Sequence, residues 1–179
     1  MRRAWILVSV IALVLAACGK DTPSSEESFD QYFSSPAKVV EGIIHAYETR
    51  NDSLYAAFLS DDFRYYFEPQ GSDSMDVLGW GKEEEVVGTA SLFNTPDVES
   101  LDYELQLGSG RTVDEAGKEG WKLIPVKGGR MVISVKDKDP VEVVLNRQEI
   151  VFRPDILKKW RVVEWHDYPD PNSEAAGGE

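Results

Sequence analysis

Cysteine and histidine are nearly absent from this 179-residue chain, which contains one cysteine and two histidines. With no cysteine beyond Cys18, the rest of the chain has no disulfide, no thiolate metal site and no cysteine nucleophile. A zinc site would need carboxylates for most of its ligands, so we predict no metal. The sequence also lacks the His-Glu-x-x-His, Gly-x-Ser-x-Gly, P-loop and Cys-x-x-Cys motifs, and we expect no cofactor.

Positive charge is also scarce. The chain has 19 Lys and Arg against 32 Asp and Glu, a formal net charge of -13, and no run of more than two consecutive basic residues. Such a surface repels phosphate backbones, so we expect no nucleic-acid partner. It also disfavours electrostatic adhesion to anionic lipid, so any membrane attachment has to be hydrophobic or covalent.

The N-terminus offers such an attachment. A pair of arginines at positions 2–3 precedes an apolar run over 4–17, which is too short to span a bilayer and suits a signal-peptide core. The run ends in Leu15-Ala16-Ala17-Cys18, which resembles the bacterial lipobox. The resemblance implies that residues 1–17 are a signal peptide and that Cys18 becomes the lipidated first residue of a lipoprotein. The alternative is an ordinary signal peptide with an accidental cysteine.

The segments flanking the domain follow from this interpretation. Cysteines of this type carry more than one acyl chain, enough for stable anchoring in the cell-envelope membrane. Gly19 stands where an inner-membrane retention signal has Asp, which implies the outer membrane, facing the periplasm, in a Gram-negative organism. We expect residues 18–34 to start as a flexible, polar and Ser-rich tether, in which the apolar Phe29, Tyr32 and Phe33 begin the packed part. Residues 169–179 lack apolar periodicity and are expected to form a disordered tail.

Helices are predicted first in the segment 35–168. Ser35 and Pro36 suit a helix start, and apolar residues then recur at helical spacing as far as Tyr47. Asp52 is expected to cap a short second helix. A third helix is predicted over 81–93; its first turn holds three glutamates, which we expect to lie on a solvated face.

Strands follow. The chain alternates apolar and polar residues, or runs apolar between turn signals, over 63–67, 101–107, 121–126, 130–136, 141–152 and 160–167. In the segment 141–152 the apolar positions change from odd to even numbers. A period of two requires an extra residue for such a change, so we expect a bulge near 146–149 and a sharply bent strand.

This order of elements resembles the NTF2-like (SnoaL-like) superfamily over 35–168. The resemblance rests on the amphipathic first helix, on Leu59-Ser60-Asp61-Asp62-Phe63 after the second, and on the closing strand over 159–167. It implies an α+β cone in which N-terminal helices pack on a strongly bent antiparallel sheet of four to six strands, with a pocket beneath the first helix. The superfamily includes isomerases, dehydratases and cyclases, and also non-catalytic binding domains, so the fold leaves the function open.

The last strand carries the candidate catalytic residues. Glu164 and His166 share one face with Trp160, and the alternate face holds a second tryptophan, so periodicity does not decide which face is buried. If the first face lines the pocket, desolvation raises the pKa of Glu164 and the pair can move a proton. Otherwise these residues point to solvent or pair with a basic side chain.

Aromatic residues supply the expected pocket lining: Tyr47, Tyr65, Tyr103, Trp121 and Trp160. We favour a non-catalytic, membrane-anchored domain that binds a small apolar ligand or an envelope protein. An isomerase, dehydratase or cyclase using Glu164 or His166 is the first alternative. A structural envelope component, with no pocket and a large apolar patch, is the second. The valine-rich segment Val141–Leu145 suggests a homodimer formed through the sheet.

Overall fold

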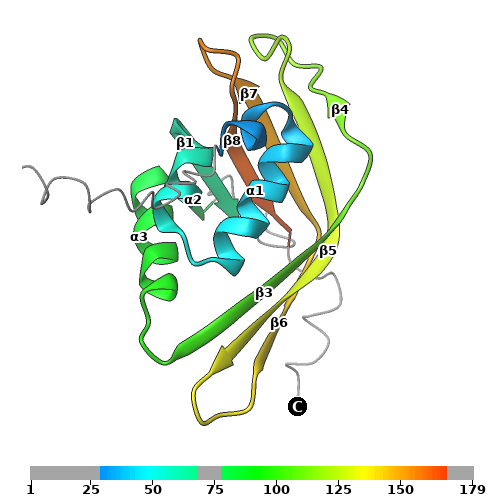
Figure 1. Cartoon of the computed structure of the whole chain (residues 1–179). Coiled ribbons are helices and arrows are strands. Elements are labelled where there is room, and N and C mark those ends of the chain that lie inside the picture. The colour runs from blue at the N-terminus through cyan, green and yellow to red at the C-terminus, as the bar shows by residue number, and fades with distance from the viewer. Residues whose placement is uncertain (1–28, 68–77, 169–179) are drawn as a thin grey trace, which may run out of the picture.

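The computed structural model describes residues 29–67 and 78–168. Within these residues, three α-helices and one 3-10 helix pack on one face of a curved, open sheet of eight strands (Figure 1). The expected α+β fold, with N-terminal helices on a bent sheet, is confirmed. None of the helices in these residues is long and apolar enough to cross a membrane.

The first two helices begin at capping side chains. Helix α1 (Pro36–Glu48) starts after Ser35, whose hydroxyl accepts a hydrogen bond from a backbone N–H of the first turn, as predicted. Helix α2 (Asp52–Phe58) is capped by Asn51, whose side-chain oxygen accepts from the N–H of Leu54 at 2.9 Å. The expectation that Asp52 is the cap was wrong, because Asp52 already occupies the first helical position.

Helix α3 (Lys82–Phe93) lies where it was predicted and is preceded directly by an unpredicted strand, β2 (Leu78–Gly81). The Glu84 carboxylate accepts a hydrogen bond from the N–H of Gly81 at 3.1 Å and so satisfies a free donor at the helix start. Strand β2 pairs with β1 and places Trp80 directly opposite Tyr65. The start of α3 is therefore fixed to the edge of the sheet.

The remaining strands are β1 (Leu59–Phe67), β3 (Val98–Leu107), β4 (Arg111–Thr112), β5 (Lys122–Val135), β6 (Val141–Leu145), β7 (Gln148–Pro154) and β8 (Trp160–Asp167). Their order is β2-β1-β8-β7-β5-β3, and β4 and β6 also pair with β5. The expected range of four to six strands was too low, because the short strands β2 and β4 have no strong pattern. The sheet is also not wholly antiparallel, since β1 and β8 run parallel.

The sheet bends at one level across several strands. Strand β5 runs continuously through Gly128 and Gly129, where two separate strands were expected. Gly128 has a φ of 151°, and a Cβ on Gly129 would lie 2.2 Å from the carbonyl oxygen of Glu104 on β3. Opposite these glycines the partner strand breaks between β6 and β7, within the predicted bulge region 146–149. The phase change is thus a gap between two strands that pair with the two halves of β5.

The main core lies between the helices and the concave face of the sheet, with Phe58, Phe63 and Phe152 fully buried. The packed part begins at the aromatic residues Phe29, Tyr32 and Phe33, as expected. Residues Phe29–Phe33 form the 3-10 helix η2, and the Phe33 ring lies 4.9 Å from that of Phe58. The predicted tether over 18–34 therefore overlaps the domain. Residues 1–28, with Cys18, and the tail over 169–179 lie outside the described residues.

Candidate functional site

A pocket of about 210 Å³ lies between the three helices and the concave face of the sheet. Every α-helix and every strand except β4 contributes to its wall. The lining residues are Tyr47, Tyr55, Tyr65, Trp80, Glu85, Tyr103, Met131, Leu145, Gln148, Trp165 and Asp167. The bend of the sheet thus gathers residues that are far apart in the sequence.

Aromatic rings form most of this wall. The rings of Tyr65 and Trp80 stack with centroids 4.3 Å apart and planes 4° from parallel. Tyr47 stacks on Tyr103 at 4.5 Å and meets Tyr55 edge-on at 5.5 Å. Such pairs each contribute about 0.5–1.5 kcal/mol beyond the burial of area. The walls are therefore rigid, because each ring packs against at least one other.

The Glu85 carboxylate closes the helical side of the pocket. It accepts hydrogen bonds from the Tyr55 hydroxyl and from the Trp80 Nε1–H, both at 2.6 Å. Three successive helical residues point in directions about 100° apart. Glu83 and Glu84 are exposed as expected, but Glu85 turns inward, so the prediction of a solvated face was wrong for this residue.

The Asp167 carboxylate lies on the sheet side, at the end of β8. The Tyr65 hydroxyl donates to its Oδ2 at 3.0 Å. Burial first, and then the charge of Asp167, raise the pKa of Tyr65 well above its usual value. Burial, with the charge of Glu85, also raises the pKa of Tyr47 to about 12. The pocket hydroxyls therefore keep their protons at neutral pH and can act as hydrogen-bond donors.

Two buried polar side chains of the pocket have an atom without a hydrogen-bond partner among the described residues. Gln148 is 5% exposed and Trp165 is 4% exposed. The unpartnered atoms are the Gln148 Oε1, an acceptor, and the Trp165 Nε1, a donor. Leaving such a group unsatisfied costs about 1–3 kcal/mol. Both atoms belong to residues that line the pocket, so its wall contains one acceptor and one donor that no described residue satisfies.

The structure brings together three of the five predicted lining residues, Tyr47, Tyr65 and Tyr103. Trp121 is not among them, because it packs on the opposite face of the sheet beneath the guanidinium of Arg153. Trp160 lines a separate hollow near the start of α1.

Glu164 and His166 also lie away from the pocket. A register shift at Val163 makes the alternation of β8 slip by one residue, so that Val163 and Glu164 both belong to the outer face. There the Glu164 carboxylate contacts His166 Nε2 at 3.2 Å and Lys118 Nζ at 2.9 Å. The hydrogen bond with His166 and the Lys118 charge hold the pKa of Glu164 below its usual value against the effect of burial. The raised pKa that proton transfer required is absent, and the ion-pair alternative is the observed one.

Sequence reasoning missed the other eight lining residues, which are Tyr55, Trp80, Glu85, Met131, Leu145, Gln148, Trp165 and Asp167. Trp165 and Asp167 lie on the face of β8 opposite to the one on which the catalytic candidates were sought, and the register shift turns that face inward together with Val162. The other six carry no signal in a single sequence that assigns them to a pocket. Among the described residues, no group of three or more His, Cys, Asp or Glu side chains is placed to hold a metal ion.

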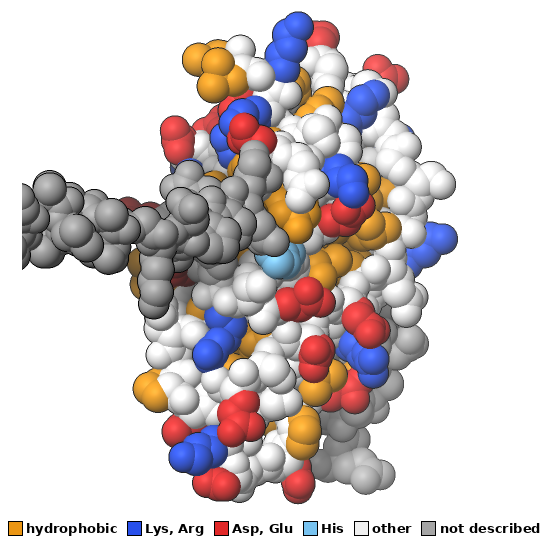
Figure 2. Space-filling view, in the orientation of Figure 1, with side chains coloured by type: hydrophobic (Ala, Val, Ile, Leu, Met, Phe, Trp, Pro, Cys, Tyr) orange, Lys and Arg blue, Asp and Glu red, His pale blue; other side chains and the backbone are white. Residues whose placement is uncertain are grey.

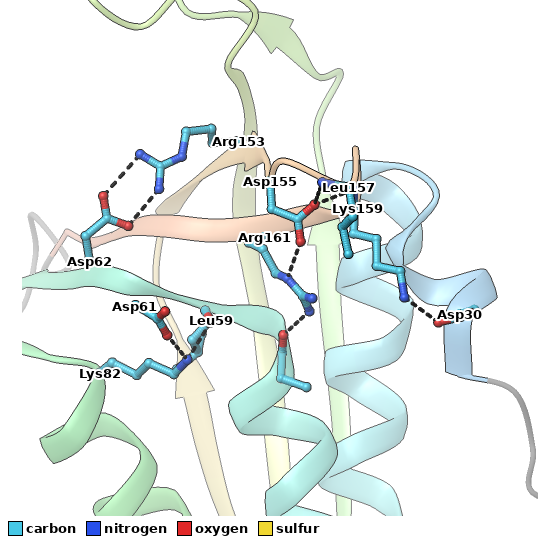
Figure 3. Close-up of polar contacts among 11 residues, drawn as sticks. Asp30, Leu59, Asp61, Asp62, Lys82, Arg153, Asp155, Leu157, Lys159 and Arg161 are labelled. Atoms are coloured by element: carbon cyan, nitrogen blue, oxygen red, sulfur yellow. Dashed lines mark hydrogen bonds and ion pairs between the residues drawn. The ribbon is translucent and has the colours of Figure 1, made fainter.

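A second hollow, of about 460 Å³, is charged rather than aromatic (Figure 3). Arg153 donates to both oxygens of Asp62, at 3.1 and 2.8 Å. Lys82 contacts Asp61 at 3.0 Å and donates to a backbone carbonyl of β1. Partial burial disfavours the charged form of Asp62, but the hydrogen bonds and the charge of Arg153 hold its pKa below the usual value.

Contacts at the same cleft link segments that lie far apart in the sequence. Arg161 donates to the carbonyl of Ala57 and lies 3.4 Å from Asp155, and Lys159 reaches Asp30 of η2 at 2.7 Å (Figure 3). The Asp155 carboxylate also accepts two backbone N–H bonds in the turn before β8. Every cation of this cleft thus has an acceptor within the protein, and the cluster fastens η2, α2 and the last hairpin together.

Comparison with known proteins finds similarity in structure only. No family model and no curated protein matches the sequence. A conserved protein from Planctomyces limnophilus superposes with a TM-score of 0.58 at 12% identity, covering 74% of this chain and 91% of its own. An NTF2-like protein of unknown function from Pseudomonas putida gives 0.53 at 16%, covering 80% and 89%.

An NTF2-like protein of unknown function in nutrient uptake, from Rhodospirillum rubrum, gives a TM-score of 0.50 at 18% identity, covering 76% of this chain and 98% of its own. At such identities a likeness shows the fold alone. The described chain is therefore an α+β domain of the NTF2-like fold, as its sequence resemblance implied.

Proposed function

We propose that this protein is a lipid-anchored, non-catalytic binding domain whose aromatic pocket holds a small, mainly apolar organic molecule. The observation that carries the proposal is the pair of unpartnered buried atoms, Gln148 Oε1 and Trp165 Nε1, at a cavity walled by aromatic rings. Natural proteins leave few buried polar groups unpaired, and binding sites are a recognised exception.

The size of the cavity limits the ligand. Pockets for drug-sized molecules run to about 300–1,000 Å³. At about 210 Å³, this pocket suits a molecule of roughly one substituted ring or a branched chain of similar bulk. Six aromatic side chains supply contact area that loses little conformational entropy on binding, because the rings already pack against one another.

Native mass spectrometry of the protein extracted from its own membranes in mild detergent tests this proposal. The wild type is expected to carry an extra mass that is lost on denaturation. Leu145→Trp fills the pocket and should abolish that mass, whereas Val144→Trp, at a neighbouring position that is 71% exposed, should retain it. An extra mass that survives Leu145→Trp, or none in the wild type, would contradict binding in this pocket. Crosslinking in the envelope would then test a protein partner.

The anchor is a separate part of the proposal and rests on the lipobox resemblance at Leu15-Ala16-Ala17-Cys18. Residues 19–28, between Cys18 and the first described residue, span at most about 35 Å when extended. Cys18→Ser should release the protein from the membrane fraction and remove the acyl mass from its N-terminus. If the variant remained in the membrane fraction, lipid anchoring at Cys18 would be wrong.

An enzyme of the isomerase, dehydratase or cyclase type is the second candidate. Its acid–base group would be Asp167 and not Glu164 or His166. The observation that favours it is the Asp167 carboxylate, which accepts a hydrogen bond from the Tyr65 hydroxyl inside the pocket. Incubating the extracted ligand with wild type and with Asp167→Asn distinguishes the two. A chemically altered product formed only by the wild type would support the enzyme, and an unchanged ligand supports binding alone.

A structural envelope component would expose a large apolar patch. On the face in Figure 2, hydrophobic side chains occur in small groups separated by charged and polar atoms. This distribution favours a small ligand in the pocket over broad apolar contact with a partner through the face in Figure 2.

A further inference from the structure

We infer that the pocket ligand is a small organic cation, an amine or quaternary ammonium that also carries one oxygen acceptor. The inference rests on the proposed function and specifies its ligand class. The two charged residues that line the pocket, Glu85 and Asp167, are both acidic, and no lysine or arginine lies among its described lining residues.

Among the described residues, the hydrogen-bond partners of these carboxylates are all neutral. Glu85 accepts from the Tyr55 hydroxyl, the Trp80 indole N–H and, at 3.4 Å, the Thr89 hydroxyl. The described partner of Asp167 is the Tyr65 hydroxyl. Neutral donors satisfy the lone pairs of a carboxylate but leave its charge uncompensated. The pocket therefore has a negative electrostatic potential, which a bound cation would neutralise.

The charged cleft provides a comparison within the same molecule. There Asp62 is paired with Arg153 and Asp61 with Lys82. At that hollow the chain neutralises carboxylates with its own basic residues, whereas no described basic residue lines the aromatic pocket. A cation supplied from outside would complete the second site in the way that Arg153 completes the first.

The aromatic wall favours the same class of ligand. The face of an aromatic ring is the negative end of its quadrupole, and a cation within about 6 Å of a ring centroid is attracted to it. Tyr65 and Trp80 form one parallel pair and Tyr47 and Tyr103 another. Rings combined with carboxylates exclude anions and suit the bulky, weakly hydrated surface of an alkylated ammonium group.

The charges of the same two carboxylates act on the pocket tyrosines. After burial, the Glu85 charge is among the causes that raise the pKa of Tyr47, Tyr55, Tyr65 and Tyr103. The charge of Asp167 adds to the raised pKa of Tyr65 and Tyr103.

The two unpartnered atoms define the polar groups of the ligand. Gln148 Oε1 can accept from an N–H or O–H, and Trp165 Nε1 can donate to an oxygen. Because both side chains are more than nine-tenths buried, neither group is freely hydrated. A small amino alcohol or its N-methylated form has the ammonium, the hydroxyl and the size that this arrangement requires.

A set of three compounds of similar size tests the charge requirement. The probes are choline, which is cationic, 3,3-dimethylbutan-1-ol, which is its neutral isostere, and 3,3-dimethylbutanoate, which is an anion of similar bulk. We expect calorimetry on the detergent-extracted protein, stripped of bound ligand, to show choline binding at least about tenfold more tightly than the alcohol. The anion should not bind at millimolar concentration.

Asp167→Asn keeps the shape of the side chain and removes its charge. It should weaken choline about tenfold and leave the neutral alcohol unchanged. Glu164→Gln, which removes a carboxylate from the opposite face of the sheet, should change neither. Circular dichroism verifies that both variants are folded.

Equal or tighter binding of the neutral alcohol would overturn the cation inference while leaving ligand binding in the pocket intact. Binding of none of the three by a protein that still carries an extracted mass would overturn the cation inference too. The proposed function itself fails only if the extracted mass is absent from the wild type or persists in Leu145→Trp.

Discussion

Replacing Gln148 with methionine separates a role in binding from a role in stability. The side chain is 5% exposed and its Oε1 has no described partner, so it carries a cost of about 1–3 kcal/mol in the ligand-free protein. Methionine has a similar volume, and repacking costs less than about 1.5 kcal/mol. The ligand-free variant should therefore gain roughly 1 kcal/mol, or about 3–5 °C in Tm for a domain of this size.

The same substitution should weaken the ligand, because methionine offers no comparable acceptor. Thermal denaturation with and without the extracted ligand measures both effects on one sample. The wild type should gain more stability from ligand than the variant does. Gln106→Met is the matched control, since Gln106 is exposed on β3 and should shift stability by less than about 0.5 kcal/mol. A loss of stability in Gln148→Met, or unchanged affinity, would refute the reasoning.

Three further predictions follow from the fold. Gly42→Ala places a Cβ 2.2 Å from the Phe58 ring and should lose about 1–3 kcal/mol in urea denaturation, whereas Gly88→Ala meets nothing within 4 Å on α3 and should gain about 0.5–1 kcal/mol. Stability should be full below pH 10, the ordinary pKa of tyrosine, and fall toward pH 12, because burial and Glu85 raise the pKa of Tyr47 to about 12 in the folded state. Tyrosinate absorbance at alkaline pH, followed with circular dichroism, measures this. Glu164→Gln should cost about 0.5–1 kcal/mol at pH 7 and nothing in strong acid, because the native pKa of Glu164 is lowered by His166 and Lys118 and its contribution is lost as pH falls.

Each of these has an outcome that contradicts it. Equal stabilities of the two glycine variants would mean that α1 and Phe58 are not in contact as described. Early, non-cooperative ionisation of all the tyrosines would show that the pocket rings are accessible to solvent. A pH-independent difference between wild type and Glu164→Gln would mean that the ion pair with Lys118 does not form.

The expected homodimer is a separate prediction. Val141 and Val144 on β6 are 51% and 71% exposed, which leaves apolar side chains available to a second copy. Val144→Lys should convert a dimer into a monomer in sedimentation analysis. A monomeric wild type would contradict dimerisation through this strand.

Long periodic segments could be predicted from the sequence because their pattern reports burial directly. Helix α1 begins at the predicted cap, and β8 has the predicted bounds, since both combine a clear start with several apolar positions in phase. The division of α1 into an apolar face and a polar face likewise follows from the 3.6-residue repeat.

The candidate site resisted prediction for a specific reason. At Val163 the strand gains one residue relative to β7, which puts Val162 and Trp165 on one face although their positions differ by an odd number. A strict period of two assigns them to opposite faces. This extra residue in β8 places Asp167 in the pocket and Glu164 on the opposite face. The side chains around Val163 have no property from which the register shift could be predicted. Trp80 and Glu85 enter the site only because β2 pairs with β1, a contact that depends on the tertiary fold.

Nuclear magnetic resonance of the tryptophan indole N–H groups tests pocket binding most directly. Trp80 and Trp165 line the pocket, and Trp121 on the opposite face is an internal control. Titration with the molecule extracted from the wild type should shift the Trp165 signal, because its Nε1–H gains an acceptor, and the Trp80 signal, while the Trp121 signal stays in place. Signals of Trp80 and Trp165 that do not move, or a shift confined to Trp121, would contradict a ligand site in this pocket.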